Sequence, residues 1–246
     1  LSAARIAETM ERLNNIFSGK ATRNAAGVNT GIQFVLAQYN PAGELMDEPG
    51  INRVTVEEVT EGTPPDKYHR FLSQNNAIWP HEKYLNIWLM SETKYPKFWN
   101  SITKLCVPKY RLGSETLPGL SLPPVPSTWV PKVEQIGILF RMSTFQYFQR
   151  SIDATAEREL VTCIGNYLGL LDTWKINNSN VNDQCNDTFA YGIVNNNGSL
   201  GTNSSWSKEV GSYRFLSENI MDDPTGTHRS VSKDQALRMY WSCRFM

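Results

Sequence analysis

Apolar residues recur at helical spacing in three stretches of the chain. The first runs from Ser2 to Phe17 and is followed by Gly19 as a stop, and the third runs from Ser232 to Cys243. The second, residues 157–174 (ERELVTCIGNYLGLLDTW), has one apolar face composed of Leu160, Val161, Ile164 and Leu168. The pattern predicts three helices. The second should end at Gly169, because glycine readily adopts the left-handed conformation of a helix stop.

Short apolar runs between these helices predict a sheet. Residues 32–37 (IQFVLA) and 135–140 (QIGILF) have the composition of buried strands, and residues 83–90 (KYLNIWLM) that of the central strand. Residues 51–59 (INRVTVEEV) and 102–108 (ITKLCVP) are typical of more exposed strands. Because strands and helices alternate, we expect an α/β (α+β) fold.

Composition limits the kinds of partner. The chain of 246 residues suffices for one large domain or two small ones, and Lys plus Arg and Asp plus Glu both total 24. A chain without net charge has no basic stripe for nucleic acid or an anionic membrane, so a protein or peptide is the expected partner. No apolar run reaches the ~18 to 20 residues of a membrane helix. The chain begins at Leu1 rather than Met, as is expected of a chain from which a signal peptide or a lipid-anchor cysteine has been removed.

The second predicted helix carries a spaced set of residues with a chemical meaning. Thr162, Cys163, Asn166, Gly169 and Asp172 have the spacing of HExxHxxGxxH, the frame with which metzincin proteases hold zinc. There the three histidines bind the metal and the glutamate acts as general base. Hydroxyl and amide oxygens are poor zinc ligands, and a thiol in place of the base leaves nothing to activate water. Only the glycine is kept, so we expect no zinc.

The chain has four cysteines, Cys106, Cys163, Cys185 and Cys243, which allow three full pairings among which spacing does not choose. There is no CxxC pair, and this excludes a zinc knuckle or a thioredoxin-like motif. Cys163 has no histidine nearby in the sequence to activate it as a nucleophile. A buried thiol or one half of a disulfide is therefore expected at this position.

Several segments together resemble the pappalysin family of metzincins, in particular its bacterial secreted and lipoprotein members. ERLNNIF resembles the end of the family's backing helix, GIQFVLAQYNPAGELMDEPGINRV its strand and hairpin, and KYLNIWLM its central strand. PGLSLPP precedes a buried strand as it does there, and VNDQCNDTF is similar to a segment ending in Asp-Thr-Pro, with Phe189 in place of the proline. ENIMDDPTGTHRSVSKDQALRMYW resembles the Met-turn, whose methionine, here Met221, lies beneath the metal, and the helix after it.

The resemblance implies a single metzincin-like domain over residues 1–246. Residues 1–172 would form a twisted mixed sheet with a backing helix and an active-site helix, and residues 173–246 an irregular C-terminal subdomain with the Met-turn and a C-terminal helix. The family's first strand should precede the opening helix; either the chain begins after it or another segment takes its place. The family carries a tyrosine after Met-Asp that can stabilise the oxyanion, and here Asp223 stands instead.

The remaining candidates for a metal site are few. The histidines are His69 in a predicted short helix at 66–74, His81 beside a proline, and His228 after the Met-turn, and no two are spaced for a common metal. We expect the first two to be solvated or capping residues, whereas His228 lies near the former site and could enter the cleft. Asp172 could still hold a metal, but a local hydrogen bond is expected. Asp183 and Asp187 with the Asn-rich loop offer oxygen ligands for calcium, but loop solvation explains the same residues more simply.

These observations favour a pseudoprotease. A protease cleft binds its substrate as an added strand at a sheet edge, and this binding needs no metal. The expected edge is formed by Thr103, Lys104, Leu105, Cys106 and Val107. The ligand would be a peptide or protein, and the chain an accessory lipoprotein on a bacterial cell surface or in an outer-membrane uptake complex. One alternative is an altered hydrolase that uses Asp172, Asn166 and His228 with some metal, and another is a structural subunit whose cleft is filled by its own side chains.

Overall fold

The computed structural model describes residues 1–23, 25–54, 72–73, 75–90, 104–107, 135–142, 155–176, 182–193, 207–210, 213–223 and 226–244. The predicted short helix at 66–74 lies mostly outside these ranges, as do most of the strand predicted at 51–59, Thr103 and His69. Within the described part, no helix is long and apolar enough to cross a membrane.

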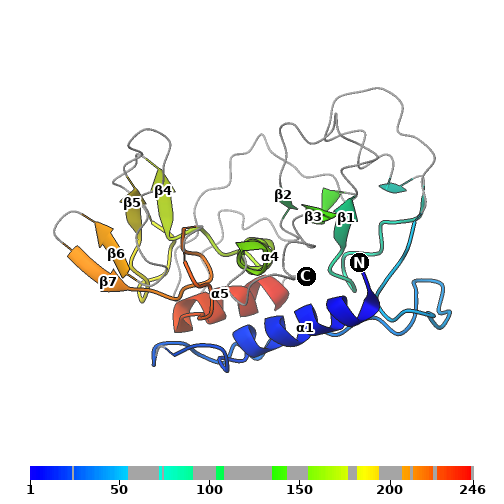
Figure 1. Ribbon diagram of the computed structural model, residues 1–246, viewed down its shortest axis with the longest axis horizontal. Helices are drawn as coiled ribbons and strands as arrows, with labels where there is room; N and C mark the ends of the chain where they lie inside the picture. Colours follow the sequence, from blue (N-terminus) through cyan, green and yellow to red (C-terminus); the bar gives the residue numbers. More distant parts are fainter. Residues whose placement is uncertain are drawn as a thin grey trace.

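The three predicted helices are confirmed (Figure 1): α1 (Ala3–Phe17), α4 (Thr155–Tyr167) and α5 (Lys233–Arg244). Ser2 caps α1 by accepting a hydrogen bond from the main-chain nitrogen of Arg5, and Gly19 follows with a φ of 76°. The buried face of α5 differs from the apolar pattern that predicted the helix. Leu237 and Tyr240 are exposed, and the fully buried residues include Gln235, Arg238, Met239 and Ser242.

The main sheet has the strand order β1-β3-β2, with β1 (Ile87–Met90), β2 (Lys104–Val107) and β3 (Gly137–Arg141). β1 runs parallel to β3 and β2 antiparallel to it, with Cys106 opposite Ile138. The run at 135–140 is confirmed as a buried strand, since Ile138 and Phe140 have almost no exposed surface. The prediction that residues 83–90 form the central strand is wrong for the described sheet, because β3 lies in the middle.

Residues 32–37 do not form the predicted strand. They are extended and turn Ile32 and Phe34 towards the core, but Val35 is 74% exposed. The side chain of Asn14 accepts from the main-chain nitrogen of Phe34 and donates to its carbonyl, in place of a neighbouring strand. A cavity of about 800 Å³ is lined by this segment, α1 and β1, and among the described residues no strand pairs with residues 32–37.

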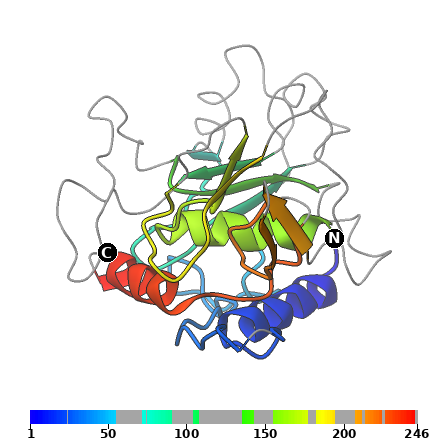
Figure 2. The same cartoon turned by 90° about the vertical axis from the view of Figure 1, so that its left-hand side faces the viewer.

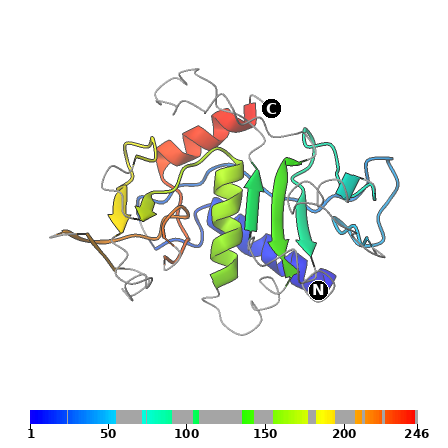
Figure 3. The ribbon, with the colours of Figure 1, turned by 90° about the horizontal axis from the view of Figure 1, so that it is seen from above.

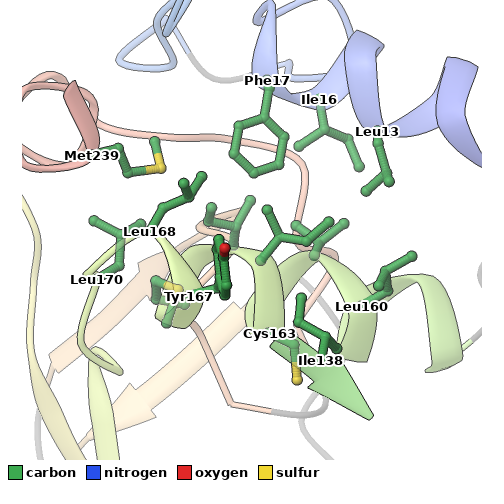
Figure 4. Packing of buried hydrophobic residues seen from close by; sticks show 14 of the residues in the cluster. Leu13, Ile16, Phe17, Ile138, Leu160, Cys163, Tyr167, Leu168, Leu170 and Met239 are labelled. Atoms are coloured by element: carbon green, nitrogen blue, oxygen red, sulfur yellow. The ribbon is translucent and has the colours of Figure 1, made fainter. Parts of the chain in front are cut away.

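The core lies on both sides of α4. Figure 2 shows the sheet on one side of this helix and α1 and α5 on the other. Figure 4 shows the packing, in which Phe17 and Leu13 from α1, Ile138 from β3 and Met239 from α5 converge on α4. The predicted apolar face of α4 is buried throughout, and burial extends to Cys163 and Tyr167. A helix enclosed in this way is a rigid base for the residues that project from it.

The C-terminal part is mostly irregular. It contains a parallel pair, β4 (Trp174–Ile176) with β5 (Tyr191–Ile193), and an antiparallel pair, β6 (Ser207–Val210) with β7 (Tyr213–Leu216). After β7 the chain forms a turn at residues 219–222 and then enters α5. The segment before β5 is tied to α5, because the carboxylate of Asp187 accepts hydrogen bonds from the Ser232 hydroxyl at 2.6 Å and the Asp234 nitrogen at 2.9 Å.

Candidate functional site

Helix α4 ends in a left-handed turn at Gly169, and this turn brings the residues after it back towards the helix. Gly169 has a φ of 88°; its nitrogen donates to the carbonyl of Asn166, and the Leu170 nitrogen donates to that of Gly165. These two bonds form a Schellman motif. The turn places Asp172 next to the helix, with 3.3 Å between Asn166 Nδ2 and Asp172 Oδ1. Two of the three former ligand positions therefore lie together.

A buried arginine fixes this turn from below. Arg238 of α5 is completely buried, and its Nε donates to the carbonyl of Gly169 at 2.6 Å. A cation at the C-terminal end of a helix interacts favourably with the helix dipole. Burial lowers the pKa of Arg238, and the nearby Cys185 and Asp183 oppose this shift. Sequence reasoning missed this residue, although a charged side chain next to Met239 in a helix that must pack is a signal for a buried partner.

The first former ligand position is engaged by the main chain. Thr162 is buried, and its hydroxyl donates to the carbonyl of Ile220 at 2.8 Å. The bond connects α4 directly to the turn at residues 219–222. The hydroxyl proton therefore points at the Ile220 carbonyl, and only a lone pair of a neutral oxygen is left to bind a metal.

The position of the general base is occupied by a disulfide. Cys163 of α4 is bonded to Cys106 of β2, with 5.5 Å between the Cα atoms and 57 residues between them in sequence. Of the two expectations for Cys163, a buried thiol or half of a disulfide, the structure has the second. Cys185 and Cys243 are free, the former buried and the latter exposed. A disulfide sulfur has no thiolate to bind a metal and no basic site to activate water.

The turn at residues 219–222, which we call the Met-turn, packs against the middle of α4. Met221 is fully buried, and a Cβ atom added to Gly165 would lie 2.5 Å from its sulfur. The carbonyl of Met221 accepts hydrogen bonds from the nitrogen and the hydroxyl of Thr173, both at 3.1 Å. Asn219 Oδ1 accepts from the Met221 nitrogen at 2.9 Å. The methionine therefore lies directly beneath the helix that carries the frame.

Asp223, which comes directly after the Met-turn, has a tyrosine as its partner. Tyr191 of β5 is buried and its hydroxyl donates to Asp223 Oδ2 at 2.7 Å. Burial, together with the charges of Asp222 and Asp223, raises the pKa of Tyr191. The bond holds the phenol inside the protein. No sequence pattern indicates this pair, because the two residues are 32 positions apart.

We predict that this buried phenol makes the protein sensitive to alkali. In the unfolded chain a tyrosine ionises near pH 10, whereas Tyr191 keeps its proton when folded, so stability is complete below pH 10 and falls above it. Each such tyrosine adds about 1.4 kcal/mol per pH unit to the slope. Urea unfolding between pH 7 and pH 12 should therefore show a shallower alkaline loss for Tyr191→Phe.

The same substitution should cost about 1 to 3 kcal/mol at pH 7, because the Asp223 carboxylate loses a buried donor. Tyr39→Phe is the matched control, since Tyr39 is exposed. An unchanged alkaline slope for Tyr191→Phe would show that the phenol ionises freely in the folded protein.

The other candidate ligands are used within the chain. His228 is buried with a φ of 51°, and its Nε2 lies 3.0 Å from the carbonyl of Asp222, which holds the ring against the main chain of the Met-turn. His81 lies 3.4 Å from Glu82. Asp183 accepts from the Thr188 hydroxyl at 2.6 Å. Among the residues that the structure describes, no group of three or more His, Cys, Asp and Glu side chains is placed to hold a metal ion.

Taken as a donor set, the frame does not fit zinc. It offers a threonine hydroxyl bonded elsewhere, an asparagine amide and one carboxylate, where zinc in proteins takes imidazole, thiolate and carboxylate ligands. These three side chains therefore lack the donors that zinc prefers. What the site retains is the helix, the turn at Gly169 and the packing on Met221.

The predicted peptide-binding edge is an edge strand of the described sheet. β2 pairs with β3 on one side only, and Figure 3 shows it alongside α4. Its members are Lys104, Leu105, Cys106 and Val107, whereas Thr103 lies outside the described residues. The structure thus brings the edge and the frame together, and the disulfide joins them.

Comparison with solved structures finds this fold in mirolysin, a metallopeptidase of Tannerella forsythia. Mature mirolysin in complex with a cleaved peptide matches with a TM-score of 0.64 and 19% sequence identity over 97% of this chain and 83% of that chain. Mirolysin in complex with compound 9 matches with a TM-score of 0.62 at the same identity and coverage. No protein-family model and no curated protein matches the chain. The likeness establishes a metzincin-like α/β fold.

Proposed function

We propose that this chain is a metallopeptidase homologue of the pappalysin type that has lost zinc-dependent hydrolysis and binds a peptide or protein. The disulfide at Cys163 carries this proposal, because it takes the place of the group that would activate water. The engaged hydroxyl of Thr162 and the amide of Asn166 support it as well. Loss of hydrolysis leaves the binding of an extended chain intact, since that binding depends on main-chain hydrogen bonds.

The binding site in this proposal is the free edge of residues 103–107. β2 is antiparallel to β3 and has no second neighbour among the described strands, so an added strand would pair with it through main-chain groups. A mirolysin structure contains a cleaved peptide, which supports a peptide as the class of ligand for this fold. We further propose a cell-surface location, as an accessory lipoprotein or as part of an outer-membrane uptake complex.

An altered hydrolase is the competing proposal, and the fold favours it, because the relatives with this fold are metallopeptidases. Such an enzyme would have to use Asp172, Asn166 and His228 with a metal other than one held by three imidazoles. His228 would have to leave the carbonyl of Asp222 to take part. A purely structural subunit is the third proposal, and it predicts that no peptide binds.

Three measurements on the purified protein test the proposal. Mass spectrometry of bound metals should find zinc far below one ion per chain, and added zinc should leave the thermal unfolding midpoint unchanged. A library of random biotinylated pentadecapeptides should contain members that bind without being cleaved. Zinc at one ion per chain, or cleavage that chelators stop, would establish the hydrolase instead, and a library without binders would favour the structural subunit.

The mode of binding can be tested on the peptide. The tightest library member is resynthesised with N-methyl groups at alternate main-chain nitrogens, which removes donors along one edge without changing the side chains. Strand addition predicts a loss of affinity of at least about tenfold for one of the two registers of methylation. Equal affinity for both methylated peptides and the parent would place the ligand elsewhere.

A further inference from the structure

The disulfide between Cys106 and Cys163 joins two elements of very different support. α4 is enclosed by the sheet, α1 and α5, and Cys163 has no exposed surface. β2 is a strand of four residues at the edge of the sheet, and its only ladder in the described structure is the one with β3. Short edge strands with a single neighbour have few hydrogen bonds to fix them. The disulfide therefore fastens a short edge strand to an enclosed helix.

The two sulfur atoms also differ in access. Cys106 is partly exposed on β2, whereas Cys163 is completely buried. Of the two halves of the disulfide, Cys106 is therefore the one nearer to solvent. The two remaining cysteines lie on other elements, in the segment before β5 and in α5. Burial raises the pKa of Cys185 to about 12, so that its thiol stays protonated and does not exchange with the disulfide.

We propose that the Cys106–Cys163 disulfide is a latch that holds β2 in the position to bind peptide, and that a dithiol reductant releases the strand and weakens binding. This inference rests on the proposed function, because it concerns the affinity of the same edge. When the edge is ordered before binding, the free energy of binding is not reduced by the entropy cost of ordering it. When the edge is released, binding includes this cost and the affinity falls. β2 pairs with β3 on one side, and no other described strand pairs with its opposite side.

The redox step is balanced by the reductant. One thiolate of the dithiol attacks the sulfur of Cys106, the bond to Cys163 breaks, and Cys163 leaves as a thiolate that takes up a proton. The second thiol of the reductant then displaces Cys106 from the mixed disulfide. The reductant loses two electrons and becomes a disulfide, and the protein disulfide becomes two thiols.

The experiment uses the full chain with Cys185→Ala and Cys243→Ala, so that the reductant acts on one disulfide only. The probe is the tightest-binding pentadecapeptide of the library. Reduction with dithiothreitol should raise its Kd by at least about tenfold, and oxidation with glutathione disulfide should restore it. The variant that also carries Cys106→Ala and Cys163→Ala should bind as weakly as the reduced protein, with or without reductant.

A second readout separates a latch from a merely stabilising bond. Hydrogen exchange of the Lys104–Val107 amides should become at least about tenfold faster on reduction, while the amides of α1 stay unchanged. If the oxidised protein binds no peptide, the proposed function fails, and the exchange of β2 still decides the latch. A bond that only stabilises the fold would lower the unfolding midpoint and leave both the Kd and the exchange of β2 unchanged, and that result overturns the inference.

Discussion

Replacing Met221 with alanine is expected to lower the free energy of unfolding by about 3 kcal/mol. The side chain is fully buried, and its sulfur lies against the backbone of α4 at Gly165, so truncation opens a cavity between the Met-turn and the helix. The carbonyl of Met221 stays bonded to Thr173, which prevents the turn from collapsing into that space. Urea unfolding monitored by circular dichroism measures the loss.

The contact between Met221 and Gly165 gives this prediction a specific control. Gly165→Ala alone should destabilise the protein by about 1 to 2 kcal/mol. The new methyl group overlaps the Met221 sulfur, and the energetic cost of this overlap exceeds the gain in helix propensity. In the Met221→Ala background the same change should stabilise by about 1 kcal/mol, since the space is free and alanine favours the helix. With Met239→Ala, another fully buried methionine, Gly165→Ala should keep its cost. Additive effects of Gly165→Ala and Met221→Ala would show that the Met-turn does not pack on α4.

Each position of the frame has a partner within the protein. Thr162 donates to the Met-turn, Asn166 lies next to Asp172, and Cys163 is bonded to Cys106. Buried polar groups in folded proteins are generally satisfied, and in a metal site the ion does part of this. Here hydrogen bonds and a covalent bond do it instead. The bond from Thr162 to the Ile220 carbonyl holds the helix and the Met-turn in their relative position.

The helices and the turn at Gly169 could be predicted from the sequence because they depend on local rules. The periodicity of apolar residues defines α1 and α4, and a glycine with positive φ ends the latter. Sheet position is not local. Residues 32–37 have a strand-like composition, but whether a strand forms depends on a neighbour that the composition does not reveal. Composition likewise predicts residues 83–90 to be the central strand, whereas β3 is the central strand of the described sheet.

The contacts that define the site could not be predicted from the sequence. Four cysteines allow three full pairings, and only the position of β2 beside α4 selects Cys106 for Cys163. The bond between Tyr191 and Asp223 and that between Arg238 and Gly169 join residues far apart in the chain. In α5 the apolar pattern indicated Leu237 and Tyr240 as core residues, whereas Arg238 is buried because it reaches the end of α4.

Restoring the zinc frame is the second change for which we expect a large effect, and the structure dictates how it is made. Thr162→His, Cys163→Glu, Asn166→His and Asp172→His rebuild the ligands and the base, and Cys106→Ala must accompany them because Cys163→Glu leaves Cys106 without its partner. Three imidazoles on one helix end and its returning turn should raise zinc affinity by at least about a thousandfold over the parent chain. Competition with a chromogenic chelator measures this affinity.

The control keeps Asn166 and carries the other four substitutions, so that it has two imidazoles and should lose most of the gained affinity. Peptide hydrolysis is not expected to return in either variant, because neither adds a group to stabilise the oxyanion and Tyr191 stays bonded to Asp223 inside the protein. The expectation rests on two features: Asp172 returns to within 3.3 Å of Asn166, and positions 162 and 166 lie one turn apart on α4. A fully substituted chain that folds, as judged by its circular dichroism, and still does not bind zinc would show that positions 162, 166 and 172 do not face a common point.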